Sequence, residues 1–278
     1  MRMQTTSLPS KLPGVWQFDV STRPRESGRA RFYHDVQLRG PIPSGLVYFP
    51  QTSAAPEQAL IEAALAWSQF EDMTPGSPAA SEALQRFDWL PVLEAAGDEG
   101  AAAIRRLMEF WLDHYGRFSS SSWRAALCAP RLIRMISNMD ALTQGVDRPM
   151  REQILDCTAR QARHLARFLK GGKERARLPV IVARTLASLC LPEDKQIGSP
   201  GAPRLGAFLR PIADGTLPVS WRDLSIAVHE ADYLLALSAA FRDRRLSAPE
   251  ELTEALKVAR LYIGGFMTDQ GGIAQLPG

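Results

Sequence analysis

The chain has little cysteine and no long apolar segment. Its three cysteines, Cys128, Cys157 and Cys190, are far apart and lie within apolar helical patterns. This placement is typical of buried free thiols and argues against a disulfide framework or a zinc site. No apolar run reaches the roughly 18 residues of a membrane span, and residues 1–13 lack the apolar segment of a signal peptide. We therefore expect a cytoplasmic chain with no membrane partner, and a periplasmic one only if the N-terminus is misassigned.

Self-sufficient catalytic and metal-binding motifs are also missing. No two of the four histidines are four residues apart, and there is no G-x-S-x-G sequence. We predict no metal and no cofactor. The net charge of +3 is too small to indicate a nucleic-acid partner. Only five of the 33 basic residues are lysine, a bias typical of GC-rich codon usage, with binding of carboxylates or sulfates by the arginine fork as the alternative.

What the sequence does contain is a series of segments with apolar residues at helical spacing. The clearest is 98–115, where Ile104, Leu107, Met108 and Trp111 lie on one face. Further helices are predicted at 56–70, at 81–96 with a kink or break at Pro91, from about 130, from 149 to about 170, and at 178–191, 204–212, 223–242 and 249–266. Short loops favour antiparallel neighbours. The prediction is an all-α domain of about nine helices.

The two ends of the chain differ in composition from this helical part. Residues 1–30 are rich in Pro, Ser and Arg, which predicts a disordered leader. The helical domain is expected at 31–268 and opens with a short extended arm. At 269–278, a Gly-Gly pair followed by apolar residues predicts a turn into a strand that has no partner in this chain.

Several motifs, in this order, resemble the helical N-terminal half of heparinase II/III-like proteins from proteobacteria. They are GLVYFPQT at 45–52, GSP at 76–78, SEALQRFDWL at 81–90, SWR at 122–124, RLIRMIS at 131–137 and TARQARHLAR at 158–167. The tail DQGGIAQL at 269–276 is similar to the family's junction with its β-sandwich.

The resemblance implies an incomplete (α/α) toroid whose groove holds an acidic, uronate-containing polysaccharide. In the family, a base removes the C5 proton of a uronic acid while its carboxylate is neutralised, and Tyr or His serves as base and acid. Here the corresponding segment, DGTLPVSWRD at 214–223, lacks His and Tyr. The β-sandwich is missing as well, which indicates either a degenerate stand-alone copy or a domain left incomplete by truncation, with a separate β-sandwich chain as one further source. We therefore expect a polysaccharide-lyase-type domain with weak or no turnover alone, and the sequence identifies no catalytic residue.

Five residues are candidate polysaccharide contacts. Arg160, Arg163 and Arg167 recur at spacings of three and four and so share one helix face. That face is either a polyanion-binding surface or a solvated outer face. Trp123 and Trp221 are predicted in loops or at helix starts, where an exposed indole could stack on a pyranose ring. Trp89 and Trp111 fall on the apolar helical stripes and are predicted to be core.

Some interpretations stay open at this point. His229 is close in sequence to Asp232 and Tyr233, which indicates either a His/Tyr acid–base pair or the ordinary content of a partly exposed helix. A non-catalytic glycan-binding or protein-interaction module is the main alternative to a lyase-type domain. An unrelated helical scaffold would explain the periodicity but not the order of the motifs.

Overall fold

A computed structural model gives the fold and describes residues 82–168, 178–192, 194–195, 197 and 202–266. This part of the chain is all-α, with ten α-helices, one 3-10 helix and no strand. The all-α prediction is confirmed. The leader, the extended arm, the helix expected at 56–70 and the tail at 269–278 lie outside the described residues.

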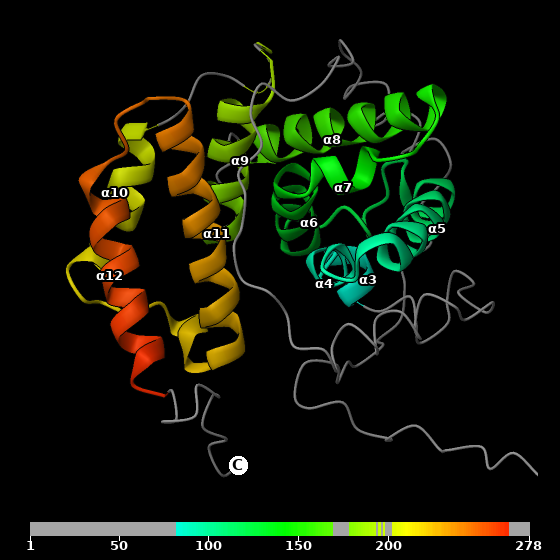
Figure 1. The fold of residues 1–278 in the computed structure, drawn as a ribbon. Coiled ribbons are helices and arrows are strands. Elements are labelled where there is room, and N and C mark those ends of the chain that lie inside the picture. The colour runs from blue at the N-terminus through cyan, green and yellow to red at the C-terminus, as the bar shows by residue number, and fades with distance from the viewer. Residues whose placement is uncertain (1–81, 169–177, 193, 196, 198–201, 267–278) are drawn as a thin grey trace, which may run out of the picture.

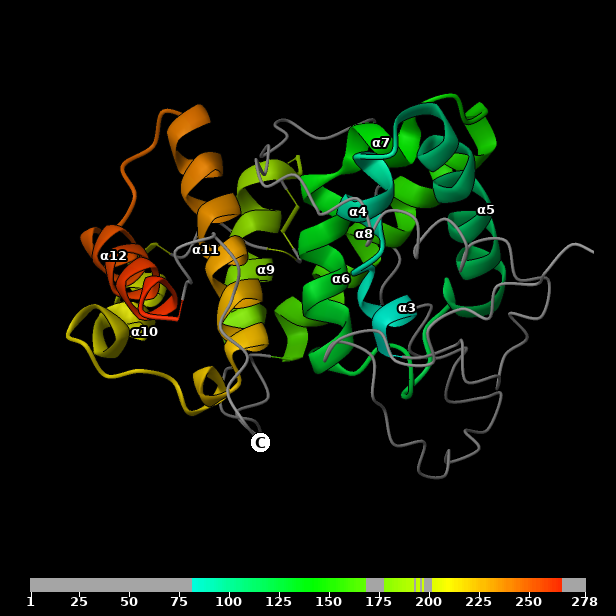
Figure 2. The ribbon, with the colours of Figure 1, turned by 60° about the horizontal axis from the view of Figure 1, so that its bottom comes forward.

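The helices form two groups that meet at two shared helices (Figure 1, Figure 2). The shared helices are α6 (Ala125–Ser137) and α8 (Arg148–Phe168). The first group contains α3 (Glu82–Arg86), α4 (Leu90–Glu94), α5 (Gly97–Tyr115) and α7 (Met139–Thr143). The second contains α9 (Leu178–Cys190), α10 (Ala202–Ala213), the 3-10 helix η2 (Val219–Arg222), α11 (Leu224–Asp243) and α12 (Glu250–Gly264).

Each group has its own hydrophobic core, and the shared helices contribute to both. In α6, Leu132 and Ile136 lie in the core of the second group, whereas Met135 lies in the core of the first. In α8, Leu165 lies in the core of the second group and Ile154 in the core of the first. Eleven of the thirteen residues of α6 are buried, as expected for a helix that is covered on all sides. This helix is therefore the centre of the described part of the chain.

Two expected helix boundaries were wrong. The segment 81–96 does divide, but at a turn around Phe87 (φ 61°), while Pro91 lies in the first turn of α4, a position that proline tolerates. The helix expected to begin near Pro130 begins at Ala125 instead, with Pro130 inside it. The backbone carbonyl of Arg124 accepts the first hydrogen bonds, including one from the Cys128 amide at 2.8 Å.

The apolar composition of α11 reflects its place in the core. By length and composition this helix could cross a membrane. Ten of its residues are nevertheless buried, and it packs against α9, α12 and η2. Burial inside the second group therefore accounts for its hydropathy.

A buried arginine joins the elements of the first group. Arg131 in α6 is 0% exposed. Its Nε donates to Gln161 Oε1 at 2.7 Å, Nη1 to the Gln85 carbonyl at 2.7 Å and Nη2 to the Ser122 carbonyl at 3.0 Å. Its guanidinium carbon lies 4.6 Å from the ring centroid of Trp111. No carboxylate in the described part of the chain pairs with it, and burial lowers the pKa of Arg131.

We predict that Arg131→Met lowers the free energy of unfolding by about 2–4 kcal/mol, because three buried acceptors lose their donors. Arg148→Met is the matched control. Its side chain is 89% exposed, so its effect should stay below about 0.5 kcal/mol. Urea denaturation followed by circular dichroism measures both, and equal midpoints for the two variants would contradict the role of Arg131.

Candidate functional site

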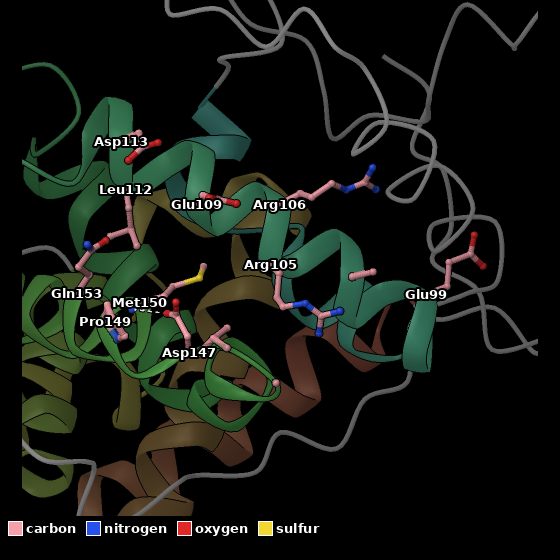
Figure 3. A pocket seen from close by; sticks show the side chains of 13 residues that line it. Glu99, Arg105, Arg106, Glu109, Leu112, Asp113, Asp147, Pro149, Met150 and Gln153 are labelled. Atoms are coloured by element: carbon pink, nitrogen blue, oxygen red, sulfur yellow. Dashed lines mark hydrogen bonds between the residues drawn. The ribbon is translucent and has the colours of Figure 1, made fainter.

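A groove of about 930 Å³ lies between α5 and the loop that enters α8 (Figure 3). Carboxylates, guanidinium groups and several apolar side chains line it, but no histidine, cysteine, serine or tyrosine does. The groove therefore offers a binding surface without an evident nucleophile or a general base near neutral pH.

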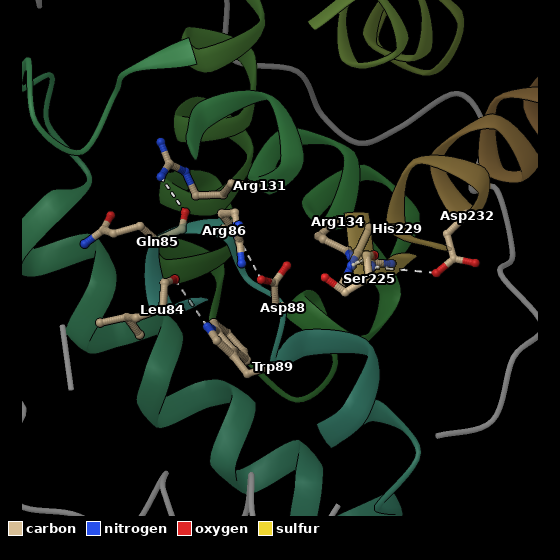
Figure 4. Close-up of polar contacts among 10 residues, drawn as sticks. All are labelled: Leu84, Gln85, Arg86, Asp88, Trp89, Arg131, Arg134, Ser225, His229 and Asp232. Atoms are coloured by element: carbon tan, nitrogen blue, oxygen red, sulfur yellow. Dashed lines mark hydrogen bonds and ion pairs between the residues drawn. The ribbon is translucent and has the colours of Figure 1, made fainter. Parts of the chain in front are cut away.

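A second polar site lies between the α3–α4 turn, α6 and α11 (Figure 4). Arg134 of α6, with a side chain only 7% exposed, is at its centre, and its Nη2 lies 3.9 Å from Asp232 Oδ2. The guanidinium carbon is 5.4 Å from the ring centroid of Tyr233. Arg134 Nε is buried and has no hydrogen-bond partner among the described residues. This Nε–H can therefore donate one further hydrogen bond. Because an unpaired buried donor is costly, an acceptor placed there would be favourable.

The α3–α4 turn brings a carboxylate to the same site. Asp88 Oδ2 accepts from Arg86 Nε at 2.9 Å, while Asp88 Oδ1 is buried without a partner among the described residues. Between them, Phe87 adopts the left-handed backbone conformation, which costs a non-glycine residue about 1–2 kcal/mol. The Phe87 ring is 0% exposed and lies 4.9 Å from the ring of Trp89, so core packing holds the turn. The charges of both Arg86 and Asp88 act on Tyr233.

Helix α11 supplies the titratable groups. His229 Nδ1 lies 2.7 Å from the Ser225 carbonyl oxygen. Because a carbonyl oxygen can only accept, we assign the proton to Nδ1, which leaves Nε2 as a basic nitrogen. Burial raises the pKa of the Tyr233 phenol, so Tyr233 stays protonated near neutral pH and does not act as a base there. Burial also raises the pKa of Asp232, against the nearby charges of Arg134 and His229.

This site combines a cation, a basic ring nitrogen and a protonated phenol. Such a set can bind a carboxylate and move a proton at an adjacent carbon. Sequence analysis considered His229 and Tyr233 but missed Arg134 as a site residue. The available signal was the pair Arg131 and Arg134, which interrupts the apolar sequence of α6 at a spacing of three.

The predicted arginine face does not lie in solvent along its whole length. Arg163 has a side chain only 1% exposed, and its Nε lies 2.8 Å from Asp194 Oδ2. Arg160 Nη1 is 3.6 Å from Asp156 Oδ2, and the Arg160 guanidinium lies 5.7 Å from the ring centroid of Trp123. Only Arg167 is exposed. The expectation of a continuous solvent-facing row is therefore corrected, since carboxylates and an aromatic ring cover Arg160 and Arg163.

The two predicted sugar-stacking tryptophans are buried, each only 1% exposed. Trp123 Nε1 donates to the Tyr115 carbonyl at 3.0 Å. Trp221 Nε1 donates to Glu230 Oε2 at 2.7 Å, and the Trp221 carbonyl accepts from the Tyr262 hydroxyl at 2.6 Å. Neither ring offers a free face for a pyranose. The expected groove exposure is corrected, because both indoles are buried and hydrogen-bonded to residues of neighbouring helices.

The cysteines are free and buried, as the sequence predicts. Cys128 Sγ lies 3.5 Å from Gln161 Oε1, and Gln161 Nε2 lies 3.4 Å from Cys157 Sγ. Burial raises the pKa of Cys128 to about 11 and that of Cys157 to about 12. In the part of the chain that the structure describes, no cluster of His, Cys, Asp and Glu could hold a metal ion.

Comparison with known proteins gives one informative similarity. The chain is similar to FtsZ-localized protein C of Caulobacter vibrioides (strain NA1000 / CB15N), with 29% identity over 203 residues. These residues cover 70% of this chain and 34% of that protein, so the chain spans about a third of its length. No protein family matches the sequence, and no solved structure is similar to it.

We predict that Cys128 and Cys157 of the folded protein resist iodoacetamide at pH 8. The reactive species is the thiolate, and burial keeps the pKa of both thiols well above that pH. Both should react fully in urea. Mass spectrometry of the labelled peptides measures this, with unfolded protein as the control, and rapid labelling of the folded chain would contradict the arrangement of the cores.

Proposed function

We propose that the chain is the helical domain of a heparinase II/III-like protein of polysaccharide-lyase type, and that it binds an acidic, uronate-containing polysaccharide. The observation that carries this proposal is the buried Arg134 guanidinium, with its unpaired Nε, beside Tyr233 and Asp232, with His229 one turn before Asp232 on α11. A uronate carboxylate would give Arg134 the acceptor that it lacks, in a charge-assisted hydrogen bond. Closure of the helices into an incomplete toroid around the polysaccharide belongs to the same proposal.

Elimination from a uronate has three tasks, and the site offers a group for each. The carboxylate must be neutralised, the C5 proton removed, and the leaving oxygen protonated as its bond to C4 breaks. Arg134 suits the first task, His229 Nε2 the second and Tyr233 the third. Turnover by this chain alone would be weak or absent, because Arg134 is nearly enclosed and Asp232 competes for it. A β-sandwich, on the same or on a separate chain, would complete the site.

We predict that Arg134→Gln weakens binding to polygalacturonate about tenfold or more, because it removes a charge-assisted hydrogen bond. Arg148→Gln loses the same charge at an exposed position and should bind like the unchanged protein. Isothermal titration calorimetry measures the affinity, with neutral dextran as the control ligand. The ultraviolet absorbance of the unsaturated uronate product reports elimination.

Each outcome of this experiment separates one part of the proposal from the others. Equal affinities of the two variants would exclude the Arg134 site. Binding without the unsaturated product would assign a non-catalytic glycan-binding module. Failure of the unchanged protein to bind any acidic polysaccharide would remove the polysaccharide proposal altogether.

A second candidate function is a protein-interaction module in bacterial cell division. The similarity to FtsZ-localized protein C supports it, and cytoplasmic residence belongs to this candidate. The burial of Trp123 and Trp221, which leaves neither indole free to stack on a sugar, also favours it. The Arg134 site would then be a structural feature of the domain.

On this second candidate, a fluorescent fusion of the chain should co-localise with FtsZ in the cells that encode it. The purified chain should also sediment with FtsZ polymers. Arg134→Gln should leave both results unchanged, which distinguishes this function from polysaccharide binding. A diffuse distribution in dividing cells, together with no co-sedimentation, would contradict the candidate.

A further inference from the structure

We propose that the groove between α5 and the start of α8 is a docking surface for a basic, amphipathic segment of a partner protein (Figure 3). The groove shares no residue with the Arg134 site and does not depend on the function proposed for that site.

The apolar part of the groove lies where the two helices approach each other. Leu112 of α5 and Met150 of α8 are only partly buried and pack against the core of the first group. Val146 in the connecting loop is half-buried beside them. A groove between two helices with aliphatic side chains along it is a usual acceptor for the apolar face of an amphipathic segment. Its volume of about 930 Å³ is within the range of ligand sites, about 300–1,000 Å³.

The net negative charge of the groove favours a cationic partner. Four carboxylates and two guanidinium groups line it, an excess of two negative charges in a chain whose net charge is +3. The carboxylates are those of Glu99, Glu109, Asp113 and Asp147. Complementary charge on a partner would both orient the encounter and speed it.

Two of these carboxylates are available to a partner. Glu109 and Asp113 are exposed, lie four residues apart on α5, and have no ion pair among the described residues. Like charges at that spacing repel each other, so a cation between them would be favourable. Asp147 instead accepts a hydrogen bond from the Met150 amide at 2.9 Å. Arg105 extends toward the loop of Asp147.

Arg105 contacts the loop and forms no ion pair with Glu109 or Asp113 among the described residues. A Cβ atom at Gly145 would lie 3.3 Å from Arg105 Nη1, so this guanidinium covers the backbone there. Gly145 has a φ of 67°, a conformation that glycine adopts without strain. We therefore place the partner's basic side chain at Glu109 and Asp113, and its apolar side chains on Leu112 and Met150.

The test uses the full chain and a fluorescein-labelled amphipathic peptide of Leu and Lys, with a Leu and Glu peptide as the control probe. Fluorescence anisotropy should show preferential binding of the Leu/Lys peptide. The double variant Glu109→Gln/Asp113→Asn should bind it roughly three- to tenfold more weakly, as expected for two exposed ion pairs. Asp214→Asn/Glu250→Gln removes the same charge at exposed positions on the second group and should bind like the unchanged protein.

Three results would overturn the proposal. One is the absence of any preference for the Leu/Lys peptide. Another is an equal loss of affinity in both double variants, since overall charge would then explain the binding. The third is a change of sedimentation coefficient in Glu109→Gln/Asp113→Asn alone, which would assign the groove to a second copy of this chain.

Discussion

The packing of the first group depends on one of the buried cations, Arg131. Arg131 has three hydrogen-bond acceptors drawn from α3, from the loop before α6 and from α8, and it lies over the ring of Trp111 in α5. No carboxylate in the described part of the chain balances its charge, so oriented carbonyl dipoles and a π face take that role. Each contact comes from a different element, and the guanidinium therefore fixes their relative positions as apolar side chains alone could not.

The burial of α6 around Arg131 also leaves a polar atom of this helix without a hydrogen-bond partner among the described residues. One turn after Arg131, Arg134 projects toward α11, where Asp232 is a distant partner at 3.9 Å and Nε has none in the described residues. Arg131 and Arg134 are three residues apart on one helix, but only the guanidinium of Arg131 has hydrogen-bond acceptors for its Nε, Nη1 and Nη2 atoms. Arg131 is fully enclosed, whereas the Arg134 side chain keeps 7% of its surface exposed. The cost of the unpaired Nε must be borne by the surrounding packing.

The sequence was sufficient to predict the long helices of the described part, such as α5, α8 and α11, since apolar spacing over ten or more residues is a strong signal. It also placed Trp89 and Trp111 correctly in the core. It could not place Arg163 or Trp221, whose partners, Asp194 and Glu230, come from other segments. A polar residue on an otherwise apolar helix looks the same whether it faces water or a buried acceptor. Only the tertiary structure decides between the two.

The two candidate sites differ in the surroundings of their polar groups. This difference affects what each site can bind. At the α3–α4 turn, a strained backbone at Phe87 holds Asp88 with one buried oxygen unpaired, next to the unpaired Arg134. Strain and unsatisfied groups together are typical of positions that a ligand completes. The groove on α5 has no buried unpaired polar atom of this kind among its described residues, since Glu109 and Asp113 are exposed. A ligand gains there mainly from shape, apolar contact and complementary charge, which favours a peptide segment over a small polar molecule.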